Sequence, residues 1–351
     1  MPTVIDGTTG INKVQAAAVA DKANLAGSAT QAFSATTAAP GTNTTQVATT
    51  EFVHNEITGR NRIINGLCQI DQRNSGAAQT ITAGAALAYT IDRSYAYCTG
   101  ASITGQQLVA NGRSTYRFTG AASNTGVGWG QRIEAQNSYD LAGTFASLRI
   151  NLASTSLTSI TWKAYYANTA DTFGTLITPT RTQFATGTFD VSATEGVKIQ
   201  EGITVPAAAY TGIEVEFTGG ALLAGQTLTY GDVQFEPGLI CHELERPHVD
   251  RVLLGCLRYY ERMGGASLAI FTQGYAGTSG YYGKILTFLA KKRAVPVVTP
   301  FGSWALTNTT ISSFDSPTTT GVRHLLQATA AGALSSATVD STTHIEIKAE
   351  L

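Results

Sequence analysis

The chain contains few charged residues. Asp, Glu, Lys and Arg make up 13% of its 351 residues, against about 25% in an average soluble domain. The formal net charge is -1, so no basic field exists to attract nucleic acid or an anionic membrane surface. No run of about 18 or more apolar residues occurs, and no membrane-spanning helix is predicted. Uncharged polar residues and glycine take the place of charge, which is typical of a β-rich protein that works outside cells or is partly buried in an oligomer.

Cysteine is also scarce. Its four copies form no Cys-x-x-Cys pair, so a zinc site is not expected: Cys68, Cys98, Cys241 and Cys256. A disulfide between Cys68 and Cys98 and four free, mostly buried thiols both stay open, and the free thiols are favoured. The first residues lack the basic start and apolar run of a secretory signal, so assembly in a reducing cytoplasm is expected.

Residues 1–60 differ in pattern from the rest of the chain. A seam typical of a short coiled coil runs in three- and four-residue steps, interrupted by Asp21: Ile11, Val14, Ala18 and Leu25. After a small-residue linker, Thr49 or Thr50 can cap a second helix with an apolar stripe that ends at Ile57. Neither helix can bury its stripe alone, so both are expected to pack against copies of themselves.

Residues 61–245 alternate between strand patterns and turns. "TFASLRINLAS", "SLTSITWKAYYA" and "GIEVEFTGG" each place apolar side chains on one face with a period of two. Short strands separated by Gly, Asn, Thr and Pro predict an antiparallel sandwich or jelly roll. No alternation of strand and helix appears, so a parallel nucleotide-binding sheet is not expected.

A short helix is predicted over 246–258, after Pro247, which can occupy a first helical turn. Its apolar residues follow helical spacing: Val249, Val252, Leu253, Cys256 and Leu257. Cys256 falls on the buried face, and the nearby arginines point elsewhere in this register. A buried thiol without a neighbouring base or positive charge is inert. We therefore predict a structural joint here and no catalytic centre.

Residues 259–351 predict a C-terminal β-sandwich. "RYYERM" is expected to form its first strand, closed by Gly264 and Gly265. A long strand is expected through "YYGKILTFLAKKRAVPVVTPF", and Pro296 and Pro300 place it at the edge or end of a sheet.

Carboxylates suggest no convincing active site. Glu134 with Asp140, or Glu214 with Glu216, could supply the acid and base of a glycosidase. Glu214 and Glu216 share one strand face, however, and are expected on solvated surface. "CHELERPHVD" contains metal-ligand residue types in no recognised spacing, and "SGYYGK" lacks the second glycine and the Ser or Thr of a phosphate loop. No catalytic residue, metal or cofactor is predicted.

Aromatic side chains are the remaining candidates, because a sugar ring presents apolar C–H faces that stack on them. Trp162, Tyr165 and Tyr166 lie within a strand pattern and are expected in the core. Other aromatic residues lie in Gly-rich segments or beside turns, where exposure is expected. They are the predicted glycan contacts: Tyr275, Tyr281, Tyr282, Trp304 and Trp129.

Several motifs, taken in order, resemble those of bacteriophage tail fibres and receptor-binding proteins. "PGTNTTQVATTEFV" is similar to an element of their virion-proximal part. "INGLCQIDQRNSG…AYTIDRS" resembles the opening of their carbohydrate-binding-module-like jelly roll, with Ser94 where the family has Trp. "YDLAGTFASLRINL" and "LTYGDVQFEPG" are similar to its middle and closing strands, and Gln234 and Glu236 match the closing pattern. "LGCLRYYER" resembles the next joint, and "FLAKKRAVPVVTP" with "KAEL" resembles the tip domain.

The resemblance covers nearly the whole chain and implies a mainly β homotrimer. The implied parts are an N-terminal helical and extended attachment segment (1–60), a jelly roll (61–245), a linking helix (246–258) and a C-terminal β-sandwich tip (259–351). Residues 1–60 would bind other tail or baseplate proteins, and the distal part would bind a host cell-surface glycan. The expected location is the virion tail, after assembly in the host cytoplasm.

The expected function is host attachment without enzymatic activity. One alternative is a purely structural virion component, such as a head fibre, baseplate or collar protein. Another is a polysaccharide depolymerase, although the sequence lacks the roughly 20–30-residue repeat of a β-solenoid.

Overall fold

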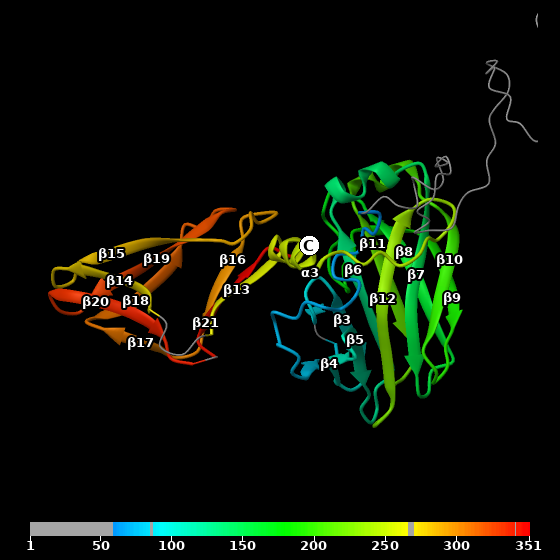
Figure 1. The fold of residues 1–351 in the computed structure, drawn as a ribbon, viewed down its shortest axis with the longest axis horizontal. Coiled ribbons are helices and arrows are strands. Elements are labelled where there is room, and N and C mark those ends of the chain that lie inside the picture. Colours follow the sequence, from blue (N-terminus) through cyan, green and yellow to red (C-terminus); the bar gives the residue numbers. More distant parts are fainter. Residues whose placement is uncertain (1–58, 85–86, 266–269, 341) are drawn as a thin grey trace, which may run out of the picture. The chain divides into compact units, whose positions relative to one another are not determined.

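The computed structural model describes residues 59–84, 87–265, 270–340 and 342–351 (Figure 1). The helices predicted within residues 1–57 therefore lie outside the described residues. Residues 58–351 belong to one compact unit. In the described part of the chain, no helix is long and apolar enough to cross a membrane.

Two antiparallel six-stranded sheets face each other between Gln79 and Pro237 (Figure 1). The first has the order β1 (Gln79–Ile81), β4 (Ile103–Ala110), β5 (Arg113–Thr119), β12 (Thr227–Pro237), β7 (Phe145–Ser154), β10 (Gly196–Thr204). The second has the order β2 (Ala88–Tyr89), β3 (Tyr95–Thr99), β6 (Gly126–Ile133), β11 (Ile213–Gly219), β8 (Ser159–Ala167), β9 (Arg181–Asp190). Three short 3-10 helices join strands: η1 (Ala135–Asn137), η2 (Tyr139–Leu141) and η3 (Ala207–Thr211).

The strand pairs of this sandwich are nested along the chain. β8 pairs with β9, β7 with β10, β6 with β11 and β5 with β12, and successive pairs alternate between the two sheets. Nested hairpins that alternate between two sheets define a jelly roll. The fold predicted for this part of the chain is therefore observed.

The core between the sheets follows the alternation read from the sequence. Ile213, Val215 and Phe217 of β11 are buried, as are Ile160, Trp162 and Ala164 of β8. On β7 the even-numbered residues face inward, so Leu148 and Ile150 are buried whereas Phe145 is 42% exposed.

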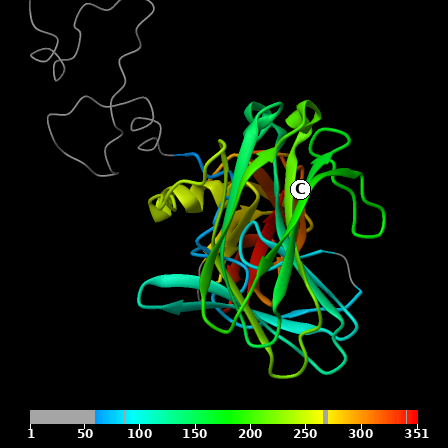
Figure 2. The ribbon, with the colours of Figure 1, turned by 90° about the vertical axis from the view of Figure 1, so that its right-hand side faces the viewer.

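The predicted helix is observed as α3 (Val249–Leu257). The ring of His248 caps its first turn by accepting a hydrogen bond from the backbone N–H of Asp250, whose carboxylate suits the positive end of the helix dipole. Its buried residues include Cys256, as the spacing predicts. Gly255 lies against Ile64, so the helix packs on the segment that leads into the sandwich (Figure 2).

The C-terminal module, predicted as a β-sandwich, is built of strands throughout its described residues. It contains three three-stranded sheets. In each sheet the central strand comes from the last part of the chain. The first sheet has the order β13 (Tyr260–Gly264), β21 (His344–Lys348), β16 (Val297–Phe301), and the second has the order β14 (Ile270–Ala276), β20 (Gly332–Thr338), β17 (Trp304–Thr307). The third has the order β15 (Tyr281–Thr287), β19 (Gly321–Ala328), β18 (Thr309–Asp315). Two small apolar clusters, one around Ile345 and Ile347 and one around Leu326 and Leu334, replace a single large core.

The long strand predicted over 281–301 is broken into β15 and β16. Between them, Lys292 is fully buried and forms an ion pair with Glu261 at 2.5 Å. Its Nζ also donates to the backbone carbonyl of Leu257. This buried charge fixes the 288–296 connection against the start of β13, and an extended strand could not place it there. β16 lies at a sheet edge, as Pro296 and Pro300 predict.

The segment after α3 is a structural joint, as predicted. The guanidinium of Arg93 stacks on the ring of Tyr259 at 3.5 Å, and that of Arg73 stacks on Tyr260 at 3.8 Å. Both arginines also form ion pairs with Glu350 near the C-terminus. Arginines of the sandwich therefore hold both the first and the last segment of the C-terminal module.

Candidate functional site

Two tyrosines flank the turn between β14 and β15. Tyr275 is the last residue but one of β14 and has 75% of its surface exposed, and Tyr281 begins β15 with 60% exposed. The turn is tight: the N–H of Gly280 donates to the carbonyl of Gly277, and Ser279 adopts a φ of 62°. Gly280 and Ser279 also bond to the backbone of Ala328, which anchors the turn between β14 and β15 beside the end of β19. A hydrogen-bonded backbone thus presents both rings.

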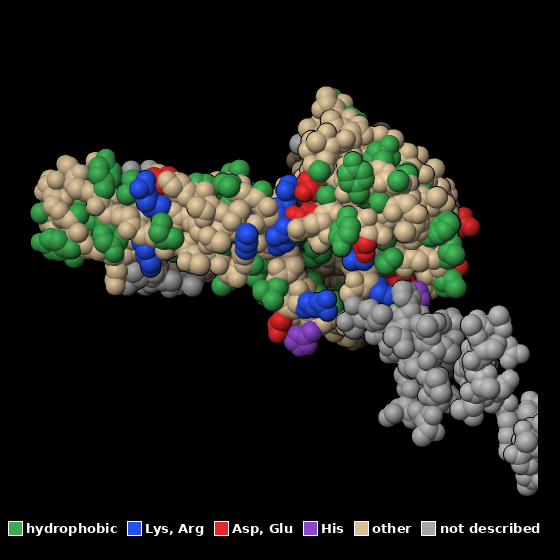
Figure 3. Space-filling model, turned by 90° about the horizontal axis from the view of Figure 1, so that it is seen from above, with side chains coloured by type: hydrophobic (Ala, Val, Ile, Leu, Met, Phe, Trp, Pro, Cys, Tyr) green, Lys and Arg blue, Asp and Glu red, His purple; other side chains and the backbone are tan. Residues whose placement is uncertain are grey.

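The residues around these rings are uncharged. Tyr281 pairs across the sheet with Gln327, which pairs with Thr310. On the neighbouring sheet, exposed Gln273 lies two residues before Tyr275 on the same strand face. These residues lie on the outward faces of two sheets that pack on each other through Gly274 and Tyr282, and we call them together the tip surface: Gln273, Tyr275, Tyr281, Thr310 and Gln327. On the face seen in Figure 3, hydrophobic side chains gather at the left-hand end of the C-terminal module, and the Lys and Arg side chains of this module lie farther from that end. Aromatic rings among amides and hydroxyls can stack on a sugar and hydrogen-bond its hydroxyl groups.

Tyr282 and Trp304, the next two predicted contacts, face inward. Tyr282 is half-buried against the Leu326 and Leu334 cluster and lies over Gly274, where a Cβ would come within 2.4 Å of its ring. Trp304 is half-buried in an aromatic cluster, 5.1 Å from Phe271 between ring centroids. Both residues support the module from within.

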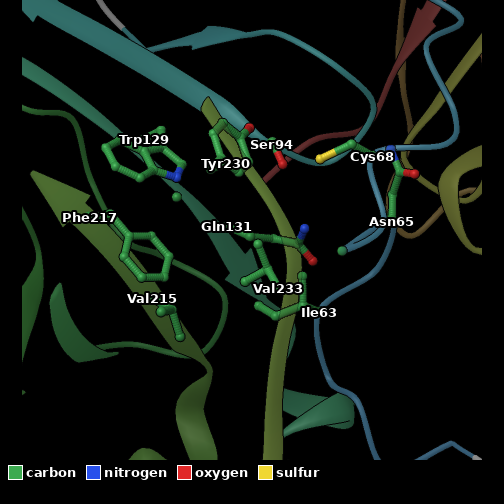
Figure 4. A pocket seen from close by; sticks show the side chains of 12 residues that line it. Ile63, Asn65, Cys68, Ser94, Trp129, Gln131, Val215, Phe217, Tyr230 and Val233 are labelled. Atoms are coloured by element: carbon green, nitrogen blue, oxygen red, sulfur yellow. The ribbon is translucent and has the colours of Figure 1, made fainter. Parts of the chain in front are cut away.

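The predicted exposure of Trp129 is wrong. This residue is 1% exposed and lies in the core of the sandwich, stacked on Phe217 and Tyr230 at 5.3 Å (Figure 4). The surrounding glycines suggested a loop, but they belong to β6. Gly128 and Gly130 leave room on the opposite face of that strand for the rings of Tyr97 and Tyr95.

The prediction that Glu214 and Glu216 lie on solvated surface is wrong. Both side chains are buried, with 0% and 2% exposure. Glu214 accepts hydrogen bonds from Tyr95 at 2.6 Å and from Arg132 at 3.1 Å. Glu216 accepts them from Tyr97 and Tyr165, each at 2.9 Å.

Arg181 from β9 completes this network by pairing with both carboxylates, at 2.5 Å and 3.2 Å. Burial and the neighbouring carboxylates raise the pKa of Tyr95 and of Tyr97, so both phenols stay protonated and donate. The two carboxylates are thus held by arginines and phenols, and neither is placed as a free acid or base. We call these residues the Glu–Arg–Tyr network: Tyr95, Tyr97, Arg132, Tyr165, Arg181, Glu214 and Glu216.

In the other candidate acid and base pair, each carboxylate also forms an ion pair with an arginine. Glu134 is paired with Arg258 at 3.1 Å, and Asp140 with Arg62 at 2.5 Å. Within the described ranges, no group of three or more His, Cys, Asp and Glu side chains could hold a metal ion.

The cysteines are free thiols, and Cys68 and Cys98 are not bonded to each other. Cys68, Cys98 and Cys256 are buried, and desolvation raises the pKa of each. Burial also raises the pKa of Cys241, to about 11. Thiols with raised pKa values are poor nucleophiles, which agrees with a structural role.

Comparison with known proteins gives matches among solved structures alone. No protein-family model matches the chain, and no curated protein matches it significantly. A CBM4 structure is similar to 50% of the chain over 98% of its own length, with 18% identity and a TM-score of 0.31. A family 11 carbohydrate-binding module from Clostridium thermocellum, in complex with a β-1,3-1,4-mixed-linked tetrasaccharide, matches 47% of the chain over 98% of its own length, with 9% identity and a TM-score of 0.28.

A phage protein is also among the matches. It is the enzymatically active domain of tailspike protein 4 of bacteriophage CBA120, with 11% identity and a TM-score of 0.28. The match covers 51% of this chain and 21% of the tailspike chain.

Proposed function

We propose that this protein is a bacteriophage tail fibre or receptor-binding protein that attaches the virion to a glycan on the bacterial surface. The observation that carries the proposal is the tip surface, where Tyr275 and Tyr281 are exposed among uncharged amides and hydroxyls. Such a surface suits a sugar, whose C–H faces stack on the rings while its hydroxyl groups bond to the amides. The order of the tail-fibre motifs along the sequence supports the same function.

In this proposal the protein is a homotrimer whose residues 1–60 bind the virion. Three weak tip contacts around one axis, repeated over several fibres, would combine into firm adsorption. We expect deletion of residues 1–60 to abolish binding to fibreless particles while leaving a folded trimer, measured by sedimentation velocity. A monomeric deletion product would place the trimer contacts in the removed segment and contradict this arrangement.

The test of the function itself is competition. Purified full-length protein is expected to coat host cells and to block phage adsorption as its concentration rises. Protein that binds virions but never cells would overturn host attachment in favour of a structural component. Release of reducing sugar from host polysaccharide would instead identify a depolymerase.

A purely structural role is the second candidate for the sandwich itself. On its outer sheet face, the carboxylates, phenols and guanidinium groups of the Glu–Arg–Tyr network bind one another. A face whose polar groups are already paired offers few groups to a ligand. In this arrangement the sandwich is a spacer and the tip surface makes the contact.

A further inference from the structure

A groove lies at one edge of the sandwich, between the last strands of its two sheets. β10 ends the first sheet and β9 ends the second, and the two strands lie side by side (Figure 1). The groove has a volume of about 490 Å³, a size typical of small-molecule sites. We call it the edge groove, and its two walls are Gln183, Phe184 and Thr186 of β9 and Gln200, Gly202 and Thr204 of β10.

Both strands carry a β-bulge where they border the edge groove. On β9, the register with β8 shifts at Phe184, which is left without a cross-strand partner. On β10, the register with β7 shifts between Gln200 and Ile203, where Gly202 adopts a φ of 65°. A bulge bends its strand and redirects the side chains beside it. Two bulges on the same gap therefore keep the strands from closing over it.

Polar side chains lie on both walls of the edge groove. Gln183 and Thr204 are exposed, and their side chains make no hydrogen bond to the described residues. Gln200 donates to the carbonyl of Glu201 at 2.9 Å, and its own Oε1 remains an acceptor. Hydrogen-bonding capacity is therefore unused on both sides of the groove.

The floor of the edge groove is apolar and fixed by the core. Trp162 is 2% exposed and stacks on Phe189, with 6.4 Å between ring centroids. Gly187 leaves room for its indole, since a Cβ there would come within 2.6 Å of Nε1. Phe184 packs partly against the same core and is half-buried, so the rest of its ring is open to a ligand in the groove.

The edge groove is uncharged. Of the described residues that line it, none is acidic or basic. Lys163, Lys198 and Glu201 lie beside it in register or in sequence, but they are not part of the lining. Glu201 already accepts a hydrogen bond from a backbone N–H at 2.8 Å. The groove therefore suits a ligand that is recognised by its hydroxyl groups and not by a charge.

We propose that the edge groove binds a short stretch of a neutral saccharide chain. One sugar face packs on Phe184, and the amides of Gln183 and Gln200 bond to hydroxyl groups from opposite sides. A polypeptide strand is disfavoured as the occupant, because strand addition needs an unbroken edge and both edges are bulged. The proposal rests on the proposed function of glycan binding and adds a second site to the tip surface. Because the groove has two walls, a chain fills it better than a single sugar does.

The test is calorimetric titration of the full-length protein with maltohexaose, cellohexaose, laminarihexaose and chitohexaose, each against its disaccharide. We expect at least one hexaose to bind about tenfold or more tightly than its disaccharide. Gln183→Ala/Gln200→Ala is expected to weaken that hexaose about tenfold, since it removes two hydrogen bonds to a neutral ligand. Phe184→Ala should weaken it as well. In the Tyr275→Ala/Tyr281→Ala protein, which lacks the tip rings, hexaose binding is expected to persist.

Failure of this proposal is distinguishable from failure of the tip surface. No binding of any hexaose at millimolar concentration, or equal binding of hexaose and disaccharide, overturns the groove proposal. Unchanged hexaose binding by a folded Gln183→Ala/Gln200→Ala protein, verified by circular dichroism, overturns it too, as does loss of that binding in the Tyr275→Ala/Tyr281→Ala protein. Groove-dependent hexaose binding by a protein that never binds cells would support the groove and contradict host attachment.

Discussion

Tyrosines occur on both the outer sheet face of the sandwich and the tip surface, but their surroundings differ. In the Glu–Arg–Tyr network, the hydroxyls of Tyr95, Tyr97 and Tyr165 each donate to a buried carboxylate. On the tip surface, the hydroxyls of Tyr275 and Tyr281 make no hydrogen bond to the described residues. The same side chain therefore stabilises one module and is available to a ligand in the other. This difference is the reason for which the proposed ligand contact is assigned to the tip surface.

The largest expected effect is the loss of stability when an aromatic ring is removed from the core of the sandwich. Trp129→Ala removes a ring that stacks on Phe217 and Tyr230, and it should lower the free energy of unfolding by about 3–5 kcal/mol. The free energy of unfolding is measured by urea titration, with fluorescence as the signal. Tyr139→Ala, at a 65% exposed residue of the same module, is the control and should change stability by less than about 0.5 kcal/mol. Similar values for the two variants would contradict the core assignment.

The second expected effect tests whether the charged network is structural. Glu214→Gln removes the carboxylate that pairs with Arg132 and one of the two that pair with Arg181, in a buried site, and should cost about 3 kcal/mol. Glu195→Gln is a matched control, because Glu195 pairs with Arg113 in an exposed position, where an ion pair contributes about 0–1 kcal/mol. Equal losses in thermal unfolding experiments would show that the buried network does not stabilise the sandwich.

The third expected effect concerns pH and the C-terminal module. His324 is fully buried beside Phe314, and desolvation lowers its pKa from 6.5 to about 4. Lys284, its cross-strand partner, opposes protonation further. Between pH 6.5 and 4 the unfolded chain binds a proton that the folded chain does not. The contribution of His324 to stability is therefore complete above pH 6.5, falls by about 3 kcal/mol down to pH 4 and is flat below.

The measurement is the pH dependence of unfolding for the parent protein and for His324→Phe, which should show a smaller slope between pH 6.5 and 4. The difference isolates His324, because burial raises the pKa of Asp92 to about 7 and gives that carboxyl a contribution of opposite sign. Identical slopes in the two proteins would contradict a neutral, buried His324.

Local pattern was sufficient to predict much of the fold. The inward faces of β8 and β11 and the register of α3 follow from side-chain periodicity alone. The exposure of Tyr275 and Tyr281 followed from their place beside a Gly-rich turn. These features depend on neighbours within a few residues along the chain.

The misjudged features depend on partners far away in sequence. Glu214 and Glu216 are buried because Tyr95, Tyr97 and Arg181 reach across from other strands. Trp129 is buried because Phe118, Phe217 and Tyr230 from other strands pack on its ring.

The central claim is that the exposed tyrosines of the tip surface bind the host. The most direct measurement compares how three fluorescent full-length proteins bind to host cells. They are the parent protein, a Tyr275→Ala/Tyr281→Ala variant and a matched Tyr139→Ala/Tyr210→Ala variant. Tyr139 and Tyr210 are 65% and 61% exposed on the sandwich. We expect the first variant to lose about tenfold or more in cell binding at unchanged melting temperature, since one base-sized stacking contact alone can account for about 1–3 kcal/mol. The second variant should bind as the parent protein does. Equal binding by all three proteins would contradict the account.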